Sequence, residues 1–516
     1  MGRVLPAQRY SDYGDFALFA IAFIVLSMFL VPISWTPALN ADSGTALSIS
    51  KALSEGDTEP LVDGLFPPFQ TVVYSIMVIV GIVNFATAVP VLFSALLAIA
   101  LAGVAHWYSR SYAVAAIPPL FLLFSSTFWQ QTGSLTFYPA FALLGYSGLF
   151  FAGRYVLETK RTPTFALLGA VLLAASLYAF TTALLFLPIP AILLAFFFNK
   201  QRMHRTLVLY AGLAVTALPW FAWHIAVGGS HFYYHPLNWL VEKHLAVIND
   251  EFWNLPHESL TEYAPTMLNV GFEGLVATPI WLLVPVGAGF IWRQHGARAG
   301  LFVMACVAFF LASLAVIRPA PYDRYFYPVL PLTIALATAG TIAISRIMPD
   351  VLKRASIAGI VFVAVAYALT VNSEASEFTN VINLDNIQKS RSYNEMLKVA
   401  DLIDDSKGII SRDSRIQSVL PDNRVSTVFL IDEADYVTYL TWPSDSEVQE
   451  MLGKYDIGWL LLYKDAGRWE RDYNVWLERN YGLKPRHYIE ASRSTEFRKV
   501  MDGRVYVLYQ VLPRGE

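Results

Sequence analysis

The chain of 516 residues is 55% hydrophobic and 15% charged, and its mean hydropathy is +0.46. A soluble protein of this size could not bury so much apolar surface, so lipid must be its main solvent. The net charge of −3 and pI near 6.3 give no basic surface for nucleic acid, because phosphate binding needs clustered Lys and Arg. Nucleic acid is therefore excluded as a partner.

The sequence contains one cysteine, Cys306, which lies inside an apolar run. One cysteine cannot form a disulfide within the chain, and it cannot build a thiolate metal cage. Redox chemistry is therefore not expected.

Apolar runs of spanning length recur through the first 371 residues, and about eleven of them predict membrane-crossing helices. The predicted spans are 16–32, 86–105, 111–126, 137–153, 163–180, 182–198, 205–227, 271–292, 299–317, 324–346 and 355–371. The first run follows two arginines as a signal sequence does, but we expect it to be retained as the first span.

One more apolar run, 69–84, decides on which side every later loop lies. If this run does not cross the membrane, the basic loops share the side of the basic N-terminus and the acidic loops lie opposite. Cytoplasmic loops carry an excess of Lys and Arg, so this arrangement is favoured. We therefore interpret 69–84 as a re-entrant or interfacial helix. The N-terminus is then cytoplasmic and the C-terminal segment extracytoplasmic, in the inner (cytoplasmic) membrane of the cell.

The composition changes after about residue 372, where charged and amide residues return and apolar stretches shrink to strand length. Strands are predicted at 407–412, 425–431, 457–463 and 504–511, and helices at 444–454 and 469–481. This alternation predicts a compact α/β domain. The predicted fold is a polytopic α-helical membrane domain over 1–371, followed by an extracytoplasmic α/β domain over 372–516.

The first external loop carries an acidic residue, Asp42, a few residues beyond the first predicted span. Ala46, Ile49 and Leu53 follow on one side of an amphipathic stretch, as in a helix that lies in the membrane interface. Asp42 suits two roles that do not exclude each other, an N-cap carboxylate for this helix or a catalytic carboxylate.

The external turn between the ninth and tenth spans, 318–331, holds two arginines among tyrosines. Arg318 and Arg324 either snorkel at the lipid boundary, with Tyr325 and its neighbouring tyrosines in an aromatic belt, or bind a lipid headgroup or lipid-linked phosphate. Both alternatives place the arginines at the membrane rim.

Together these features resemble the membrane glycosyltransferases with a GT-C fold, the class of the protein O-mannosyltransferases and the lipid A aminoarabinose transferase. In that class an acidic residue follows the first span, then come a short interfacial helix, a Pro-Pro-aromatic step and, much later, an Arg-Tyr-x-x-Pro-x-x-Pro segment. Asp42, the 44–54 stretch, Pro67-Pro68-Phe69 and residues 324–331 match these in order.

The resemblance implies an inverting transferase that moves a sugar from a polyprenyl-phosphate donor to a glycan, lipid or protein acceptor outside the cytoplasm. It implies Asp42 as general base, and Arg324 as the cation that stabilises the leaving phosphate, with help from Arg318 and Lys51. Many relatives carry a second acid in the next external loop, whereas the loop 128–138 contains none. Its polar side chains Gln130, Gln131 and Tyr138 could instead form hydrogen bonds with a sugar.

The large external loop, 228–270, contains His231 and His235 at a spacing that would place both on one face of a helix. They either bind a divalent metal ion or belong to an aromatic, hydrogen-bonding loop that covers the substrate cavity. Two glycines and a proline in this stretch favour the second alternative, so no metal ligand is assigned.

Two other functions would also suit a polytopic protein with an external domain. A transporter or flippase of a lipid-linked sugar would need phosphate-binding cations, but the predicted spans are nearly free of charge. A non-enzymatic scaffold that presents the external domain would need only one helix as its anchor. The sequence therefore favours the enzyme.

Overall fold

The computed structural model describes residue 50 and most of the chain between residues 68 and 512. The described ranges are 68–82, 88–109, 112–122, 125–133, 137–158, 163–179, 181–228, 278–317, 323–347, 391–403, 407–411, 416, 425–427, 433–463, 478 and 483–512. The spans predicted at 16–32 and 355–371, the boundary predicted near 372 and most of the helix predicted at 469–481 lie outside them.

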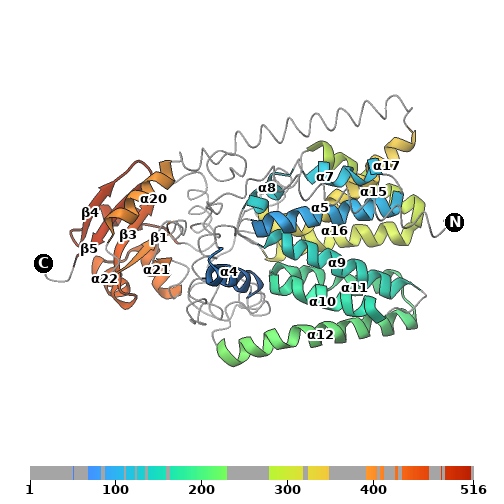
Figure 1. Ribbon diagram of the computed structural model, residues 1–516, viewed down its shortest axis with the longest axis horizontal. Helices are drawn as coiled ribbons and strands as arrows, with labels where there is room; N and C mark the ends of the chain where they lie inside the picture. The colour runs from blue at the N-terminus through green and yellow to red at the C-terminus, as the bar shows by residue number, and fades with distance from the viewer. Residues whose placement is uncertain are drawn as a thin grey trace.

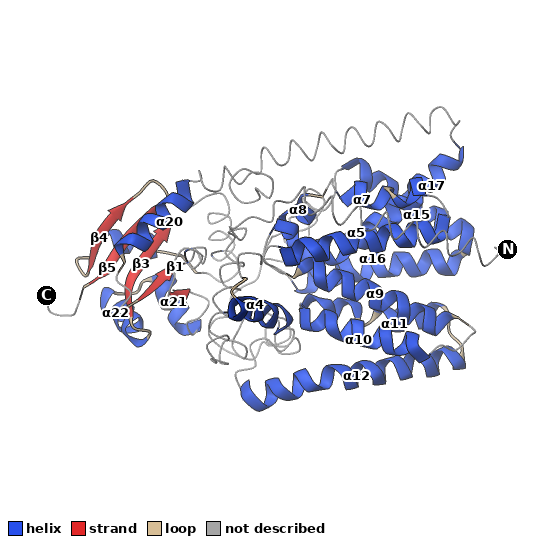
Figure 2. Ribbon diagram, in the orientation of Figure 1, coloured by secondary structure: helices blue, strands red, loops and turns tan. Residues whose placement is uncertain are grey.

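A bundle of long helices forms one end of the molecule, and a small sheet flanked by helices forms the other (Figures 1 and 2). The long helices are α5 (Ala88–Ser109), α9 (Tyr138–Leu157), α10 (Pro163–Ala179), α12 (Lys200–Gly228), α15 (Thr278–His295), α16 (Ala297–Ile317) and α17 (Leu330–Ile347). Each of them covers a predicted apolar run, and α9 packs along α10 as α15 packs along α17.

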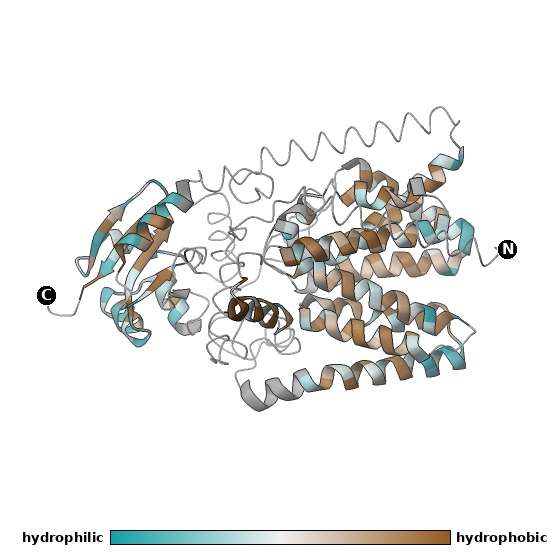
Figure 3. Ribbon diagram, in the orientation of Figure 1, coloured by the Kyte–Doolittle hydropathy of each residue, from teal (hydrophilic) through white to brown (hydrophobic). Residues whose placement is uncertain are grey.

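Three helices among the described residues are long and apolar enough to cross a membrane, namely Ala88–Ser109, Tyr138–Leu157 and Phe326–Arg346. The outer surface of the bundle carries many exposed aliphatic side chains, such as Leu167, Leu207 and Val215 (Figure 3). So much exposed apolar surface calls for lipid around it. A helical membrane part is therefore confirmed, and the number of eleven spans stays a prediction.

Two predicted spans are interrupted, because proline removes a backbone N–H and breaks the helical hydrogen-bond ladder. The run 111–126 is divided into α6 (Tyr112–Ala115) and α7 (Ile117–Leu122), and Pro118 and Pro119 lie in the first turn of α7, directly after the break. The run 182–198 is divided into a 3₁₀ helix, η2 (Thr181–Phe186), and α11 (Ile189–Phe196). Neither run forms one continuous helix.

Basic side chains join the helix ends at one end of the bundle. The Arg205 guanidinium, on the first turns of α12, donates to the carbonyl oxygen of Tyr155 over 3.2 Å and to that of Glu158, both at the end of α9. Arg154 lies over the ring of Phe165 in the first turn of α10, 4.8 Å from its centroid. These contacts bring the basic ends of three helices together.

The ends of α5, α15 and α17 meet in the same way. The Tyr108 hydroxyl lies 3.0 Å from Nε2 of His295, and the Arg346 guanidinium lies 4.8 Å from the ring centroid of Phe290. The cations of the described helices thus gather near helix ends that lie side by side, as cations at a lipid boundary do.

Helices α15 and α17 cross with their backbones in contact. A Cβ atom at Gly287 would overlap the Leu336 carbonyl oxygen and would lie 2.9 Å from the Gly340 nitrogen. A Cβ atom at Gly340 would in turn overlap the Leu283 carbonyl oxygen. Small residues allow such an approach, and they drive helix pairing in lipid, where the hydrophobic effect between helices is lost.

We predict that Gly287→Ala destabilises the protein by about 1–3 kcal/mol, because the added methyl group forces the two backbones apart. Gly289→Ala on the same helix is the matched control, since a Cβ atom there would meet nothing within 4 Å. Thermal unfolding of both variants in detergent measures the difference. Equal melting temperatures would show that α15 and α17 do not cross at Gly287.

The C-terminal sheet contains five strands among the described residues, in the order β2-β1-β3-β5-β4. They are β1 (Gly408–Ser411), β2 (Val425–Thr427), β3 (Ile457–Tyr463), β4 (Phe497–Asp502) and β5 (Tyr506–Val511). β1 pairs in parallel with β2 and β3, and β5 pairs antiparallel with β3 and β4. On β3, Leu460 and Leu462 pack into one core while Trp459 and Leu461 pack into another, so this central strand is buried on both faces.

Helices α20 (Arg391–Leu402), α21 (Glu433–Thr441), α22 (Asp445–Lys454) and α24 (His487–Arg493) accompany the sheet. The predicted helix 444–454 is confirmed as α22, whose N-cap Ser444 accepts the Glu447 backbone N–H. The strand predicted at 457–463 is confirmed with the same bounds, and the other three predicted strands are confirmed over shorter ranges. β4 was missed because this edge strand is largely exposed and carries Arg498 and Lys499 in place of an apolar run.

Candidate active site

Aromatic side chains join several elements at the end of the bundle away from the basic contacts. The ring of Phe137, just before α9, lies 5.3 Å from that of Phe69, 5.5 Å from that of Tyr74 and 5.8 Å from that of Phe93. Phe69 and Tyr74 belong to α4 (Pro68–Val80), and Phe93 belongs to α5. Aromatic pairs at these separations hold α4 against the starts of α5 and α9.

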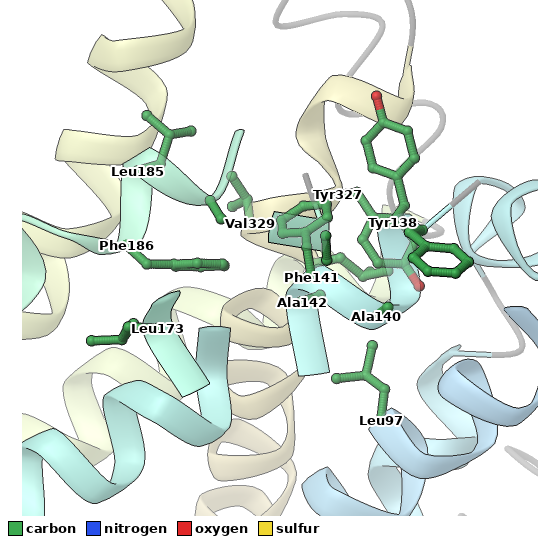
Figure 4. Close-up of a cluster of buried hydrophobic side chains, with 14 of the residues drawn as sticks. Leu97, Tyr138, Ala140, Phe141, Ala142, Leu173, Leu185, Phe186, Tyr327 and Val329 are labelled. Atoms are coloured by element: carbon green, nitrogen blue, oxygen red, sulfur yellow. The ribbon is translucent and has the colours of Figure 1, made fainter. Parts of the chain in front are cut away.

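The same aromatic packing holds η4 (Asp323–Val329), the 3₁₀ helix that precedes α17. The Tyr327 ring lies 5.8 Å from that of Tyr138 and 6.3 Å from that of Phe141, and Phe141 continues the contact to Phe186 of η2 (Figure 4). Tyr327, Phe141 and Phe186 are fully buried. η4 is thus fixed against α9 by rings that water does not reach.

A hydrogen bond fixes the backbone of η4 as well. The Tyr146 hydroxyl, on α9, donates to the carbonyl oxygen of Pro328 over 2.6 Å. Pro331 is the second residue of α17, where a missing backbone N–H has no cost to the helix. The Arg-Tyr-x-x-Pro-x-x-Pro segment therefore forms a tight turn into a helix, and its two variable residues after Tyr325 are the buried Phe326 and Tyr327.

The short helix α8 (Ser126–Gly133), which carries Gln130 and Gln131, contacts η4, α5 and α9. The side chain of Ser125 accepts the Phe128 backbone N–H over 3.0 Å and so caps the helix. The Thr132 hydroxyl lies 2.8 Å from the Ser94 hydroxyl on α5, and both residues are buried. These bonds place α8 beside the 3₁₀ helix that begins with Asp323 and Arg324.

Helix α4 is tied to the chain near the predicted interfacial stretch. The Ser75 hydroxyl donates to the carbonyl oxygen of Ser50 over 2.9 Å, and both residues are buried. Lys51 follows Ser50 in the sequence. The run predicted at 69–84 is thus a helix of 13 residues. At about 1.5 Å per residue it is too short to cross a hydrocarbon layer of about 30 Å.

The structure brings some of the predicted site residues to one place. Gln131 and Tyr138 are buried, at 4% and 2% exposure, on elements that contact η4. Arg324 and Tyr325 occupy the first turn of η4, and Gln130 lies on α8, but the side chains of these three are outside the described part. Asp42, Lys51, Arg318, His231 and His235 also lie outside it. Within the described residues no group of three or more His, Cys, Asp or Glu could hold a metal ion.

Sequence reasoning did not find the hydroxyls that position the site. Ser94 and Thr132, which form a hydrogen bond with each other, are 38 residues apart in the sequence. Tyr146 and Pro328, which are also joined by a hydrogen bond, are 182 residues apart. A single hydroxyl within an apolar run has no pattern of its own. The short pattern Ser125-Ser126-Thr127 before Phe128 was the one local signal, because serine favours helix starts.

Arranged in this way, the bundle, the short helix α4 and the C-terminal sheet form a membrane protein of the GT-C fold. No family model matches the sequence, and no curated protein matches it. Solved structures supply the comparison.

ArnT from Cupriavidus metallidurans bound to undecaprenyl phosphate is similar with a TM-score of 0.59 and 12% sequence identity, over 96% of this chain and 97% of that one. The apo structure of the same protein has a TM-score of 0.61 at 13% sequence identity, and the match covers 96% of this chain and 98% of that one. The archaeal oligosaccharyltransferase AglB from Archaeoglobus fulgidus, in complex with an inhibitory peptide and a dolichol-phosphate, has a TM-score of 0.55 at 12% identity, over 92% of this chain and 72% of that one. These similarities extend over nearly the whole chain and show its fold.

We predict that Tyr146→Phe loosens η4 at a stability cost of about 0.5–1.5 kcal/mol, because the carbonyl of Pro328 loses its donor. Tyr178→Phe is the control, since its hydroxyl donates to the Thr216 carbonyl between α10 and α12 instead. Hydrogen exchange of the amides in η4 should rise in the first variant alone. The same exchange in both variants would contradict the role of Tyr146.

Proposed function

We propose that the protein is a membrane glycosyltransferase that moves a sugar from a polyprenyl-phosphate-linked donor to a glycan, lipid or protein acceptor. The observation that carries this proposal is the match of 96% of the chain to a structure of ArnT bound to undecaprenyl phosphate. A lipid-linked donor also accounts for an enzyme built mostly from apolar helices, because the donor's chain stays in the membrane while its phosphate reaches the rim.

Arg324 is the proposed cation for the donor phosphate. When the sugar leaves, negative charge develops on the phosphate, and a fixed guanidinium stabilises this charge more in the transition state than in the bound donor. Support comes from η4 itself. Two of its residues after Arg324, Phe326 and Tyr327, are buried, and Tyr327 packs against Tyr138 of α9, which holds the backbone of η4 in place. Lys51 and Arg318 are the proposed assisting cations.

Asp42 is the proposed general base. It removes the proton of the acceptor hydroxyl or amine while that group attacks the anomeric carbon from the face opposite the phosphate, which inverts the configuration. Gln131 and Tyr138 are proposed to bind the sugar, since amide and phenol groups both donate and accept hydrogen bonds. The proposed cavity is completed by four more residues: Gln130, Tyr325, His231 and His235. The two histidines would suit a metal ion, but the proposed reaction does not require one.

The proposed location is the inner membrane, with the N-terminus in the cytoplasm and the reaction on the opposite side. The membrane domain, 1–371, would carry the reaction. The α/β domain, 372–516, would support it or recognise the acceptor. Basic residues such as Arg205 and Arg346, near the helix ends that meet opposite the aromatic cluster, support this orientation.

A transporter or flippase of a lipid-linked sugar is the alternative, and it would carry ionisable groups at mid-bilayer depth. In the described helices α5, α9, α10 and α16, the Asp, Glu, Lys and Arg residues are limited to Arg154, near the end of α9, and Arg298, near the start of α16. This distribution favours the enzyme.

We predict that Asp42→Asn lowers sugar transfer by about 10²–10⁴-fold, because the base is lost. Arg324→Ala should lower it by about 10²–10³-fold, because the phosphate loses a fixed positive charge. The measurement is transfer of radiolabelled sugar in detergent from a panel of polyprenyl-phosphate sugars. Arg298→Ala, at the basic end, is the matched control and should retain activity. Full activity of Asp42→Asn would end the general-base proposal.

A further inference from the structure

The described polar side chains of helix α4 point inward, while several of its aliphatic side chains point outward. Gln70, Tyr74 and Ser75 are buried, at 0%, 0% and 4% exposure. Among the side chains of this helix that the structure describes, the exposed ones are aliphatic, and we call them the α4 stripe: Val72 at 41%, Ile76 at 53%, Ile79 at 69% and Val80 at 63%. Their spacing of three to four residues places them along one side of the helix.

The α4 stripe needs an apolar medium. Leaving four large aliphatic side chains in water would forgo the favourable free energy of moving them into an apolar medium. Of the inward polar residues, Ser75 is held by its hydrogen bond to the carbonyl oxygen of Ser50. The helix therefore meets hydrocarbon with its outer side, although it is too short to cross the membrane.

The position of α4 sets this stripe apart from the other lipid-facing surfaces. At its start, Phe69 contacts Phe137, which immediately precedes Tyr138, and Tyr138 contacts Tyr327 of η4. Midway along, Ser75 bonds to the residue that precedes Lys51. The α4 stripe thus lies on a helix whose start packs toward η4, the element that carries the proposed phosphate-binding residue Arg324.

We infer that the α4 stripe binds the first isoprene units of the donor's polyprenyl chain. This inference rests on the proposed function and adds the surface that recognises the lipid part of the donor. A polyprenyl phosphate has an anionic head and an apolar branched chain directly attached to it. The cation proposed for the donor phosphate on η4, together with an apolar strip on the helix that packs toward it, matches that arrangement in charge and in polarity.

A chain-length comparison tests the inference through kinetics. In the double variant Ile76→Gln with Ile79→Gln, KM for an undecaprenyl-phosphate donor should rise about 10-fold, because two apolar contacts are lost. KM for a donor with a single isoprene unit, and kcat at saturating donor, should stay unchanged. The matched control is Val215→Gln with Leu218→Gln on α12, which are as exposed, at 69% and 62%, and should leave both KM values unchanged.

Photo-crosslinking tests it without turnover. A photoreactive amino acid at position 79 should crosslink to undecaprenyl phosphate, with loss of the crosslink on adding excess unlabelled undecaprenyl phosphate but not phosphatidylglycerol. A photoreactive amino acid at position 215 is the control. Equal crosslinking at both positions, or competition by phosphatidylglycerol, would mean that α4 meets only bulk lipid and would overturn the inference.

The two experiments also separate this inference from the proposed function. Crosslinking at position 79 without sugar transfer from any donor would keep the lipid-binding surface and contradict the glycosyltransferase. Sugar transfer without selective crosslinking at position 79 would keep the enzyme and overturn the inference. A rise of KM for both donor lengths in the α4 variant would overturn it too, because such a change would show damage to the site and no contact with the chain.

Discussion

The packing of η4 against α9 is the contact on which the rest of the site depends. Tyr327 lies against Tyr138 and Phe141, and the Tyr146 hydroxyl holds the Pro328 carbonyl. A 3₁₀ helix has no long hydrogen-bond ladder to keep it in place, so these side chains must do so. They fix the point at which the chain enters α17, and with it the backbone of the arginine proposed to bind phosphate.

The two ends of the bundle differ in chemistry, and this difference connects the fold to the proposed reaction. At one end Arg205 and its basic neighbours bond to the carbonyls at helix ends. At the other end uncharged rings and hydroxyls, such as Phe137 and Thr132, hold α4, α8 and η4 together. A lipid-linked donor suits the second end, because an apolar surface and a hydrogen-bonding one meet there. The glycine crossing of α15 and α17 keeps that framework rigid without charge inside the bundle.

The sequence predicted the elements with a strong local signal and missed those fixed by distant contacts. Long apolar runs revealed the bundle helices. The basic loops favoured a helix at 69–84 that does not cross the membrane; the structure has a helix of 13 residues there, and its place at the membrane interface stays a prediction. The helix break just before Pro118 was not predicted. The proline stands in the sequence, but the run around it is apolar throughout and was interpreted as one span. Strand β4 was hidden by Arg498 and Lys499, which an edge strand tolerates. The bond of Ser94 to Thr132 joins residues that no periodicity relates.

The central claim is that one carboxylate and one guanidinium, far apart in the sequence, meet at the aromatic end. Cysteine crosslinking tests it most directly, in a Cys306→Ser background that carries Asp42→Cys and Arg324→Cys. We predict that a short bifunctional maleimide joins the pair. The pair Tyr108→Cys and His295→Cys, whose native side chains lie 3.0 Å apart, is the positive control. Crosslinking of the control pair alone would contradict the account.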